Sequence, residues 1–223
     1  MAFIIKNIKD VPDTILETLN NMMNRNCQAG KFSLRNIRDK YSTNTDILYL
    51  LENDVPVYFL LLDIFAKHKT VYIHDVCVNK SNRGKGLFKK SVAVISKYYS
   101  KKGFTSLTLD ASDSTKEEGL NQKARINIFH SAGFNINLET GYFKGDGNYE
   151  IIETTVSLDD GQIVTLKTVS GKSYKATDKN GNLITIDISQ IETCYDGDAN
   201  QISCPMIINI VKNGGRKTRR NKR

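Results

Sequence analysis

Residues 71–95, VYIHDVCVNKSNRGKGLFKKSVAVI, decide the fold that we expect. The apolar run Val71–Val78 has the composition of a strand, and an amphipathic helix begins directly after Gly86. A glycine-containing turn that opens a helix is a natural anion site, because free backbone N–H groups and the positive end of the helix dipole point into it. Its glycines let a bulky phosphate approach the backbone. Four cationic side chains add positive charge around the turn: Arg83, Lys85, Lys89 and Lys90.

Two well-known phosphate motifs do not fit this turn. A P-loop needs Ser or Thr after its Lys to hold magnesium, but Gly86 follows Lys85, and no glycine stands five residues before Gly84. The G-x-G-x-x-G dinucleotide fingerprint fails because Lys89 occupies the position of the third glycine.

The composition predicts a soluble protein with one substantial domain and a small appendage. The chain has 223 residues, of which 39% are hydrophobic and 25% charged. No apolar run approaches the ~20 residues of a membrane span, and the first residues turn polar too early for a signal peptide, so we expect no membrane partner. The sequence contains four widely scattered cysteines and no C-x-x-C pair: Cys27, Cys77, Cys194 and Cys204. This spacing argues against a metal site and against a disulfide framework. Such cysteines favour a reducing, intracellular setting in the cytoplasm or nucleus, with a Cys194–Cys204 bond as the alternative.

The net charge of +8 belongs to the end of the chain. Residues 212–223, KNGGRKTRRNKR, hold seven of the 32 Lys and Arg, which leaves 25 against 24 Asp and Glu elsewhere. Such a segment is typical of a disordered tail that binds nucleic acid or directs nuclear import, with a solubilising end as the alternative. It also resembles the basic tails of many proteins of large DNA viruses.

Apolar patterns along residues 1–156 predict the order β-α-α-β-β-β-α-β-α-β. From Asp159 onward, short alternating runs predict a small antiparallel β unit that ends in a strand over 206–211 and lies on the main sheet or apart from it. We therefore expect a domain over 1–156, a β-rich extension over 157–211 and a tail over 212–223.

Within this order of predicted elements, residues 71–95 resemble motif A of the GNAT superfamily, the acetyl-CoA-dependent N-acetyltransferases. That motif is a strand ending in valine, a polar link, and Arg/Gln-x-x-Gly-x-Gly/Ala at a helix start. Val78, Arg83 and Gly86 match it, whereas Phe88 departs from the last Gly/Ala. The resemblance implies an α+β fold with a mixed, mostly antiparallel central sheet flanked by helices, and with the small antiparallel β unit as a C-terminal appendage.

A second segment, from Asn121 to Phe134, is similar to the family pattern N-x-x-A…Y…G-F. Ala124 and Gly133 match, although their spacing is one residue longer than usual, and Phe129 stands where the family has tyrosine. The two segments occur in the family's order.

The resemblance implies an acetyl-CoA site and no metal. The fourth and fifth strands would splay apart around the pantetheine arm, with the Val78 N–H as the oxyanion donor. The pyrophosphate would lie on the turn, and Asn121 or Gln122 would reach the pantetheine. The implied cofactor-binding residues are Val76, Cys77, Val78, Arg83, Gly84, Lys85, Gly86, Leu87, Phe88 and Asn121.

Acetyl transfer to an amine needs a base and an acid. For the base, Asp110 competes with His74, and less strongly with Asp75; alternation along the strand places His74 and Asp75 on opposite faces. For the acid, Phe129 cannot donate a proton, so Tyr142 is the candidate, beside His130 and Tyr149. Cys77 as an acyl-carrying nucleophile lacks a clear partner, and a small buried residue is the simpler interpretation.

We therefore expect an N-acetyltransferase that passes the acetyl group directly to a primary amine in a ternary complex. The acceptor, a protein or a small molecule, is not specified by these residues. The alternative is a CoA-binding protein with little or no turnover, tethered to nucleic acid by the basic tail.

Overall fold

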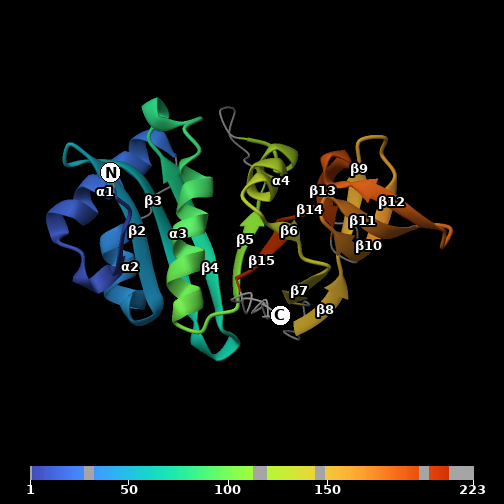
Figure 1. Cartoon of the computed structure of the whole chain (residues 1–223), viewed down its shortest axis with the longest axis horizontal. Coiled ribbons are helices and arrows are strands. Elements are labelled where there is room, and N and C mark those ends of the chain that lie inside the picture. The colour runs from blue at the N-terminus through green and yellow to red at the C-terminus, as the bar shows by residue number, and fades with distance from the viewer. Residues whose placement is uncertain (1, 28–32, 113–119, 144–148, 196–200, 211–223) are drawn as a thin grey trace, which may run out of the picture.

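The computed structural model describes residues 2–27, 33–112, 120–143, 149–195 and 201–210. A large sheet with helices on both faces lies beside a smaller β unit (Figure 1). Among the described residues, no helix is both long and apolar enough to span a membrane.

The main sheet has seven strands in the order β1-β2-β3-β4-β5-β15-β6. Of the pairs described in it, β4–β5 is parallel and the others are antiparallel. This is the mixed, mostly antiparallel sheet that the family resemblance implied. Its strands are β1 (Ile4–Asn7), β2 (Thr45–Glu52), β3 (Val55–Phe65), β4 (Thr70–Val78), β5 (Ser106–Ala111), β15 (Cys204–Asn209) and β6 (Asn135–Ile136).

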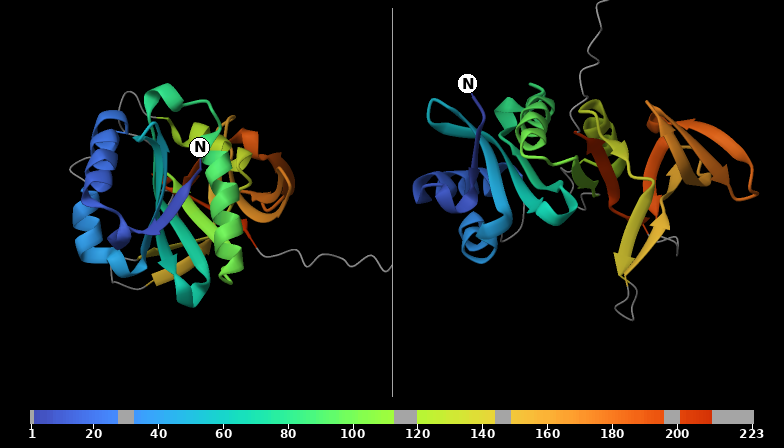
Figure 2. Two further views of the ribbon diagram at one scale, coloured as in Figure 1. Left: turned by 60° about the vertical axis from the view of Figure 1, so that its left-hand side comes forward. Right: turned by 60° about the horizontal axis from the view of Figure 1, so that its bottom comes forward.

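Within the described ranges, four α-helices cover this sheet, with α1 and α2 on one face and α3 on the other (Figure 2, left). They are α1 (Asp13–Asn26), α2 (Leu34–Tyr41), α3 (Leu87–Lys101) and α4 (Gln122–Ser131). The central strand β3 is buried on both faces: Phe59 and Leu61 pack with the α1–α2 core, whereas Tyr58 and Leu60 pack with the α3 core. The double burial explains why its sequence is apolar almost throughout.

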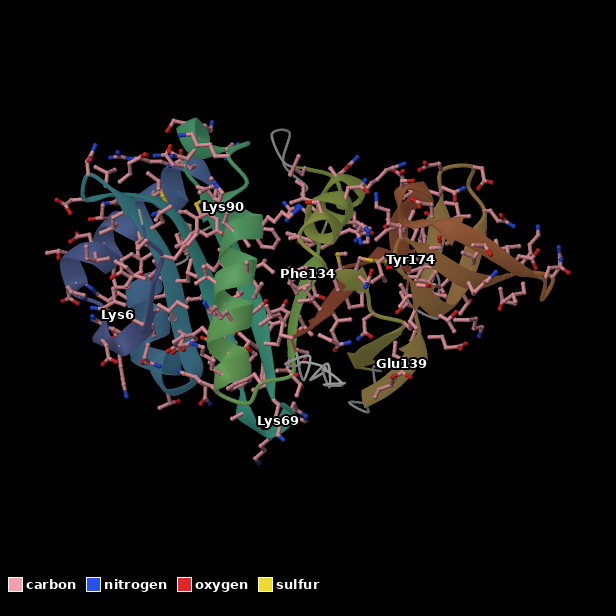
Figure 3. The ribbon with its side chains drawn as sticks, in the orientation of Figure 1. Lys6, Lys69, Lys90, Phe134, Glu139 and Tyr174 are labelled. Atoms are coloured by element: carbon pink, nitrogen blue, oxygen red, sulfur yellow. A yellow bond between two sulfur atoms is a disulfide. The ribbon has the colours of Figure 1, made fainter. Side chains whose placement is uncertain are left out.

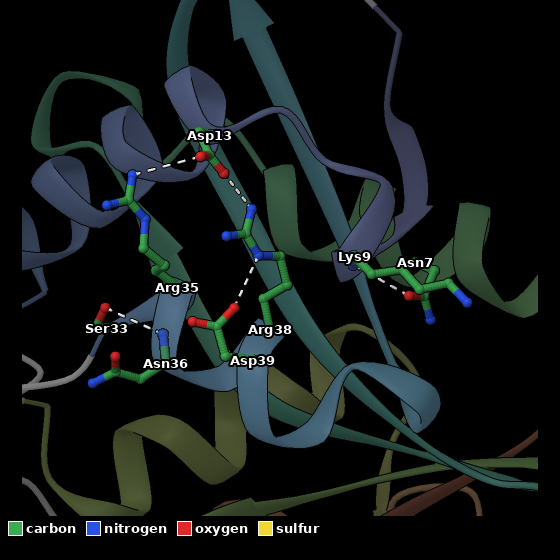
Figure 4. Close-up of polar contacts among 8 residues, drawn as sticks. All are labelled: Asn7, Lys9, Asp13, Ser33, Arg35, Asn36, Arg38 and Asp39. Atoms are coloured by element: carbon green, nitrogen blue, oxygen red, sulfur yellow. Dashed lines mark hydrogen bonds and ion pairs between the residues drawn. The ribbon is translucent and has the colours of Figure 1, made fainter.

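Polar contacts fasten α2 to the start of α1 (Figure 4). Asp13 accepts a hydrogen bond from Arg38 and lies 3.9 Å from the Arg35 guanidinium. The Ser33 hydroxyl accepts a bond from the Asn36 N–H at 3.4 Å and so caps the start of α2.

The smaller β unit is a six-stranded sheet in the order β12-β11-β10-β9-β13-β14. Its strands are β9 (Thr155–Leu158), β10 (Ile163–Ser170), β11 (Ser173–Asp178), β12 (Leu183–Asp187), β13 (Ile191–Tyr195) and β14 (Gln201–Ile202), and β7 (Glu139–Phe143) pairs separately with β8 (Tyr149–Glu153). Phe134 packs against Phe88 of α3, whereas Tyr174 belongs to the β unit (Figure 3), and the Tyr174 hydroxyl accepts a bond from the Ile136 N–H of β6. One continuous core includes both residues, so the unit packs on the main sheet.

The strand pairing departs in one respect from the division that we expected at residue 157. The last strand, β15, was assigned to the extension, but it pairs with β5 and β6 in the main sheet. The strands β7 to β14 thus come, along the chain, between two strands of that sheet, β6 and β15. The sequence pattern shows that residues 206–211 favour a strand, but the partner of a strand depends on contacts far along the chain.

The expectation of unpaired cysteines was wrong. Cys27 is bonded to Cys77 and Cys194 to Cys204, with Cα atoms 5.8 Å and 5.2 Å apart. The first pair meets because α1 ends over β4, and the second because β15 returns beside β13. The Cys194–Cys204 bond is the alternative given above, between residues only 10 apart, whereas the Cys27–Cys77 bond joins residues 50 apart and follows from the fold rather than from the cysteine spacing.

Candidate functional site

The fourth and fifth strands part, as expected, well before either of them ends. Parallel pairing of β4 with β5 ends at Tyr72 and Thr108, although the strands continue to Val78 and Ala111. A cavity of about 280 Å³ lies where they diverge. Its wall includes Ile73–Cys77 of β4, Leu109 and Asp110 of β5, Met23 and Cys27 at the end of α1, and Arg125 and Phe129 of α4.

The backbone of β4 offers hydrogen-bonding groups to this gap. The Asn79 N–H donates to the Val57 carbonyl at 3.0 Å, and Val78 is paired with Tyr58 next to it. In an antiparallel ladder, successive residues alternate in the side to which their N–H and C=O groups point. The N–H groups of Val78 and Val76 therefore point away from β3 and toward the gap, as an oxyanion donor or a partner for an extended ligand must.

The turn between β4 and α3 has the geometry of an anion site. Gly84 and Gly86 have φ values of 76° and 67°, in the left-handed region that favours glycine. A Cβ on either residue would meet nothing within 4 Å, so open space lies in front of both. Gly86 is the N-cap of α3 and leaves the first turn without a side-chain cap. Leu87 is the first residue of that helix. Around the start of the helix three lysine side chains are exposed, those of Lys85, Lys89 and Lys90, the last of which is labelled in Figure 3.

Arg83 has a different partner from the one that the motif suggested. Its guanidinium donates to the Asn26 carbonyl at 2.6 Å, at the end of α1. The Asn26 side chain in turn accepts a bond from the Lys80 N–H at 3.3 Å. Arg83 thus fastens α1 to the turn, and its charge lies at the negative end of the α1 dipole.

Asp110 lies in the cavity wall and has a tyrosine partner. The Tyr72 hydroxyl donates to its carboxylate at 2.9 Å. Burial raises the pKa of the Asp110 carboxyl, and the hydrogen bond from Tyr72 offsets part of this effect. Burial, followed by the negative charge of Asp110, raises the pKa of the Tyr72 phenol. At a given pH, the Asp110 carboxyl is therefore protonated to a larger extent than an ordinary aspartate.

His74 and Asp75 both line the cavity, contrary to the expectation that only one would face it. Leu61 pairs with Asp75 and Leu62 with Ile73, so His74 is the extra residue of a β-bulge, which interrupts the alternation. His74 Nδ1 lies 2.9 Å from the Asp63 carboxylate, and this hydrogen bond raises the pKa of the imidazole. Burial raises the pKa of the Asp75 carboxyl, against the opposing influence of His74.

Phe88 and Phe129, the two residues that depart from the family motifs, pack against each other. The ring centroids of Phe88 and Phe129 are 5.1 Å apart, and Phe88 also stacks on Phe134 at 6.3 Å. Phe88 therefore packs between α3 and α4 as part of the core, and Phe129 presents an apolar surface to the cavity.

Asn121 and Gln122 have structural partners at the start of α4. The Asn121 side chain caps the helix by accepting a bond from the Ala124 N–H at 2.9 Å. Gln122 is 2% exposed and donates to the Ala111 carbonyl, while its own oxygen accepts bonds from Thr193 and Cys194 of β13. Gln122 therefore joins β5 to the β unit. This buried structural role does not fit the expectation that Gln122 could reach the pantetheine arm.

Tyr142, the expected acid, lies on β7 opposite Glu150, and its side chain is outside the described part of the chain. In Figure 1, β7 lies level with the start of β5, away from the end of β5 that borders the cavity. The basic tail, residues 212–223, also lies outside the described residues.

The sequence analysis missed several polar residues of the site, among them Asp63, Tyr72 and Arg125. Asp63 and Tyr72 interrupt strongly apolar strand sequences, and this is the signal that could have identified them. Arg125 follows the Asn121 cap by one helical turn and carries no comparable signal.

No family model matches the sequence, and no curated protein sequence matches it significantly. Solved structures, in contrast, are similar to it. An aminoglycoside 6'-N-acetyltransferase complexed with coenzyme A is 10% identical, with a TM-score of 0.55 over 93% of this chain and 97% of that one. The aminoglycoside 6'-N-acetyltransferase from Enterococcus faecium is 11% identical, with a TM-score of 0.54 over the same shares.

The ribosomal-protein-S18-alanine N-acetyltransferase from Escherichia coli is 12% identical, with a TM-score of 0.53 over 96% of this chain and 98% of that one. Similarity at such low identity is a statement about backbone arrangement. Together with the strand order and the parted fourth and fifth strands, it shows that the chain has the GNAT acyl-CoA N-acyltransferase fold.

Proposed function

We propose that this protein transfers an acetyl group from acetyl-CoA to a primary amine in the cavity between β4 and β5. The observation that carries the proposal is the early end of the β4–β5 pairing at Tyr72 and Thr108. It leaves an edge of β4 with outward N–H groups, and β4 leads through the glycine turn to the uncapped start of α3. An extended ligand with a phosphate at one end fits these two features together.

The residues present fit acetyl-CoA. The open turn at Gly84 and Gly86 would take the pyrophosphate, with Lys85 and the free amides of Leu87 and Phe88 beside it. The backbone of Val76, Cys77 and Val78 would hold the pantetheine arm. The fold is shared with a structure complexed with coenzyme A, which supports the same ligand class here.

Acetyl-CoA would supply an activated thioester, and the side chains of this chain would prepare the amine. The carboxylates of Asp110 and Asp75 attract an ammonium ion to the cavity, and either can accept its proton when ionised. Their raised pKa values improve them as bases compared with ordinary carboxylates. The outward N–H group of Val78 or Val76 would stabilise the developing oxyanion.

A second candidate is a CoA-binding protein with weak or no turnover. The apolar contact between Phe88 and Phe129 favours it, because the ring at residue 129 offers no proton to a departing thiolate. In this case the basic tail would tether the protein to nucleic acid.

Thermal unfolding of the full chain with acetyl-CoA, CoA or ATP tests the proposed ligand. A ligand at a hundred times its Kd stabilises the folded state by about 2.7 kcal/mol, a shift of several degrees. Stabilisation by acetyl-CoA and CoA but not by ATP supports the assignment, and release of CoA on addition of an amine then separates the enzyme from the binding protein. No stabilisation by acetyl-CoA contradicts the proposal.

A further inference from the structure

The Cys27–Cys77 disulfide lies in the wall of the proposed acetyl-CoA cavity. Both cysteines line it, beside the Val76 backbone. Cys27 follows the last residue of α1 and is partly exposed, whereas Cys77 on β4 is only 1% exposed. A reagent in the cavity therefore reaches this bond more easily at the sulfur of Cys27.

The second disulfide is sealed from solvent. Cys194 and Cys204 are both 0% exposed, and they join β13 to β15 within the core that the two sheets share. The chain thus provides one disulfide beside the cavity and a buried one for comparison.

We propose that Cys27–Cys77 is a thiol-exchange site for free coenzyme A. The inference rests on the proposed function, since acetyl transfer leaves CoA, a thiol, in this cavity. The CoA thiolate attacks Sγ of Cys27, the bond from Cys27 to Cys77 breaks, and a CoA–Cys27 disulfide forms. Cys77 leaves as a thiolate and takes up the proton that the CoA thiol lost, so no outside oxidant or reductant is consumed. Acetyl-CoA does not react, because its sulfur is held in the thioester.

The exchange distinguishes product from substrate. The adduct keeps CoA in the site, which blocks acetyl-CoA until another thiol releases it. The exchange also removes the covalent link from α1 to β4, while the bonds of Asn26 with Lys80 and Arg83 keep the end of α1 at the turn. The site thereby becomes sensitive to the ratio of free CoA to acetyl-CoA and to other thiols.

Intact-mass spectrometry of the air-oxidised full chain, without reductant, tests the inference. We expect CoA to add the mass of one CoA, about tenfold or more faster than glutathione at equal concentration, because binding concentrates its thiol beside Cys27. Excess acetyl-CoA should slow the labelling and add no mass itself. Dithiothreitol should remove the adduct, and peptide mapping should place it on Cys27.

Matched variants locate the reaction. Cys194→Ser with Cys204→Ser should keep the adduct, and Cys27→Ser with Cys77→Ser should lose it. If either pair fails to fold, peptide mapping of the native chain answers the same question. Labelling at Cys194 or Cys204, or equal rates for CoA and glutathione, overturns the inference, as does oxidised protein in which Cys27 and Cys77 remain free thiols.

Failure here is distinguishable from failure of the proposed function, because binding of acetyl-CoA to the native chain requires no exchange. Stabilisation by acetyl-CoA without a CoA adduct overturns the exchange and leaves the transferase proposal intact. Absence of both removes the cofactor site itself.

Discussion

Replacing Gln122 with alanine should destabilise the protein more than any exposed substitution on α4. This side chain is 2% exposed and forms hydrogen bonds with three partners in the described structure. It donates to the Ala111 carbonyl at 2.9 Å and accepts from the Cys194 N–H at 2.8 Å and from the Thr193 hydroxyl. Gln122 therefore links the end of β5, next to Asp110, with the β unit.

The size of the effect follows from these three bonds. Each contributes about 1 kcal/mol net, and a buried group left without a partner costs about 1–3 kcal/mol. The Thr193 hydroxyl can rotate toward another acceptor, but the two backbone groups cannot. We expect a loss of about 3–5 kcal/mol in the free energy of unfolding, or on the order of 10 °C in Tm for a chain of this size.

Urea denaturation with an unchanged m-value measures this loss. Lys123→Ala is the matched control, because the neighbouring side chain makes only partly exposed ion pairs with Asp159 and Glu192, which contribute far less. Gln122→Glu should fall between the two, since it keeps an acceptor for β13 but loses the donor to Ala111. A loss of less than about 1 kcal/mol for Gln122→Ala would refute the proposed link.

Four further substitutions test the site. Gly86→Glu should abolish stabilisation by acetyl-CoA, because it places bulk and negative charge in the turn at a φ of 67°; unchanged affinity would remove the turn from the site. Asp110→Asn should eliminate an ascending limb of the pH–rate profile that lies above the range of an ordinary carboxyl, since burial raises the pKa of Asp110; a retained limb points to another base. The stability that protonated His74 gains from Asp63 is complete below the ordinary imidazole pKa of about 6.5 and is lost as pH rises through the raised pKa. His74→Gln should therefore flatten the dependence of unfolding free energy on pH in that window, and an unchanged slope contradicts the pairing. Phe129→Tyr should raise kcat/KM by less than Asp110→Asn lowers it, and the reverse order would show that proton donation limits the reaction.

The part of the site that the sequence predicted is local. The strand Val71–Val78, the glycine turn and the following helix occupy one continuous stretch, and each follows from hydrophobic period or from the backbone freedom of glycine. The structure places these elements as β4, the turn and α3, within one residue of the predicted start of the strand. The parting of β4 from β5 was expected only through the family resemblance.

The features that the sequence missed depend on contacts between distant residues. The bulge at His74 results from the register of β4 against β3, and it brings Asp75 into the same cavity as His74. Cys27 and Cys77 are 50 residues apart and meet only because α1 packs over β4. Arg83 matched a motif, yet its guanidinium bonds to Asn26 on a different element. A pattern identifies the type of a residue and its local position, whereas its partner is decided by packing.

The absence of tyrosine at residue 129 matters less for the proposed reaction than the carboxylates do. A thiol with a pKa of about 8.5 leaves as a thiolate at neutral pH at a cost of about 2 kcal/mol, even without an acid. An amine with a pKa of about 10.4 must lose its proton before it attacks, which costs about 4.6 kcal/mol at the same pH. Deprotonation of the amine is therefore the larger cost, and Asp110 and Asp75 line the cavity where a base is needed. A tyrosine in place of Phe129 would lower only the smaller cost, that of thiolate departure. The contact between Phe88 and Phe129 is therefore compatible with turnover, and the ionisation of Asp110 or Asp75 should set its pH dependence.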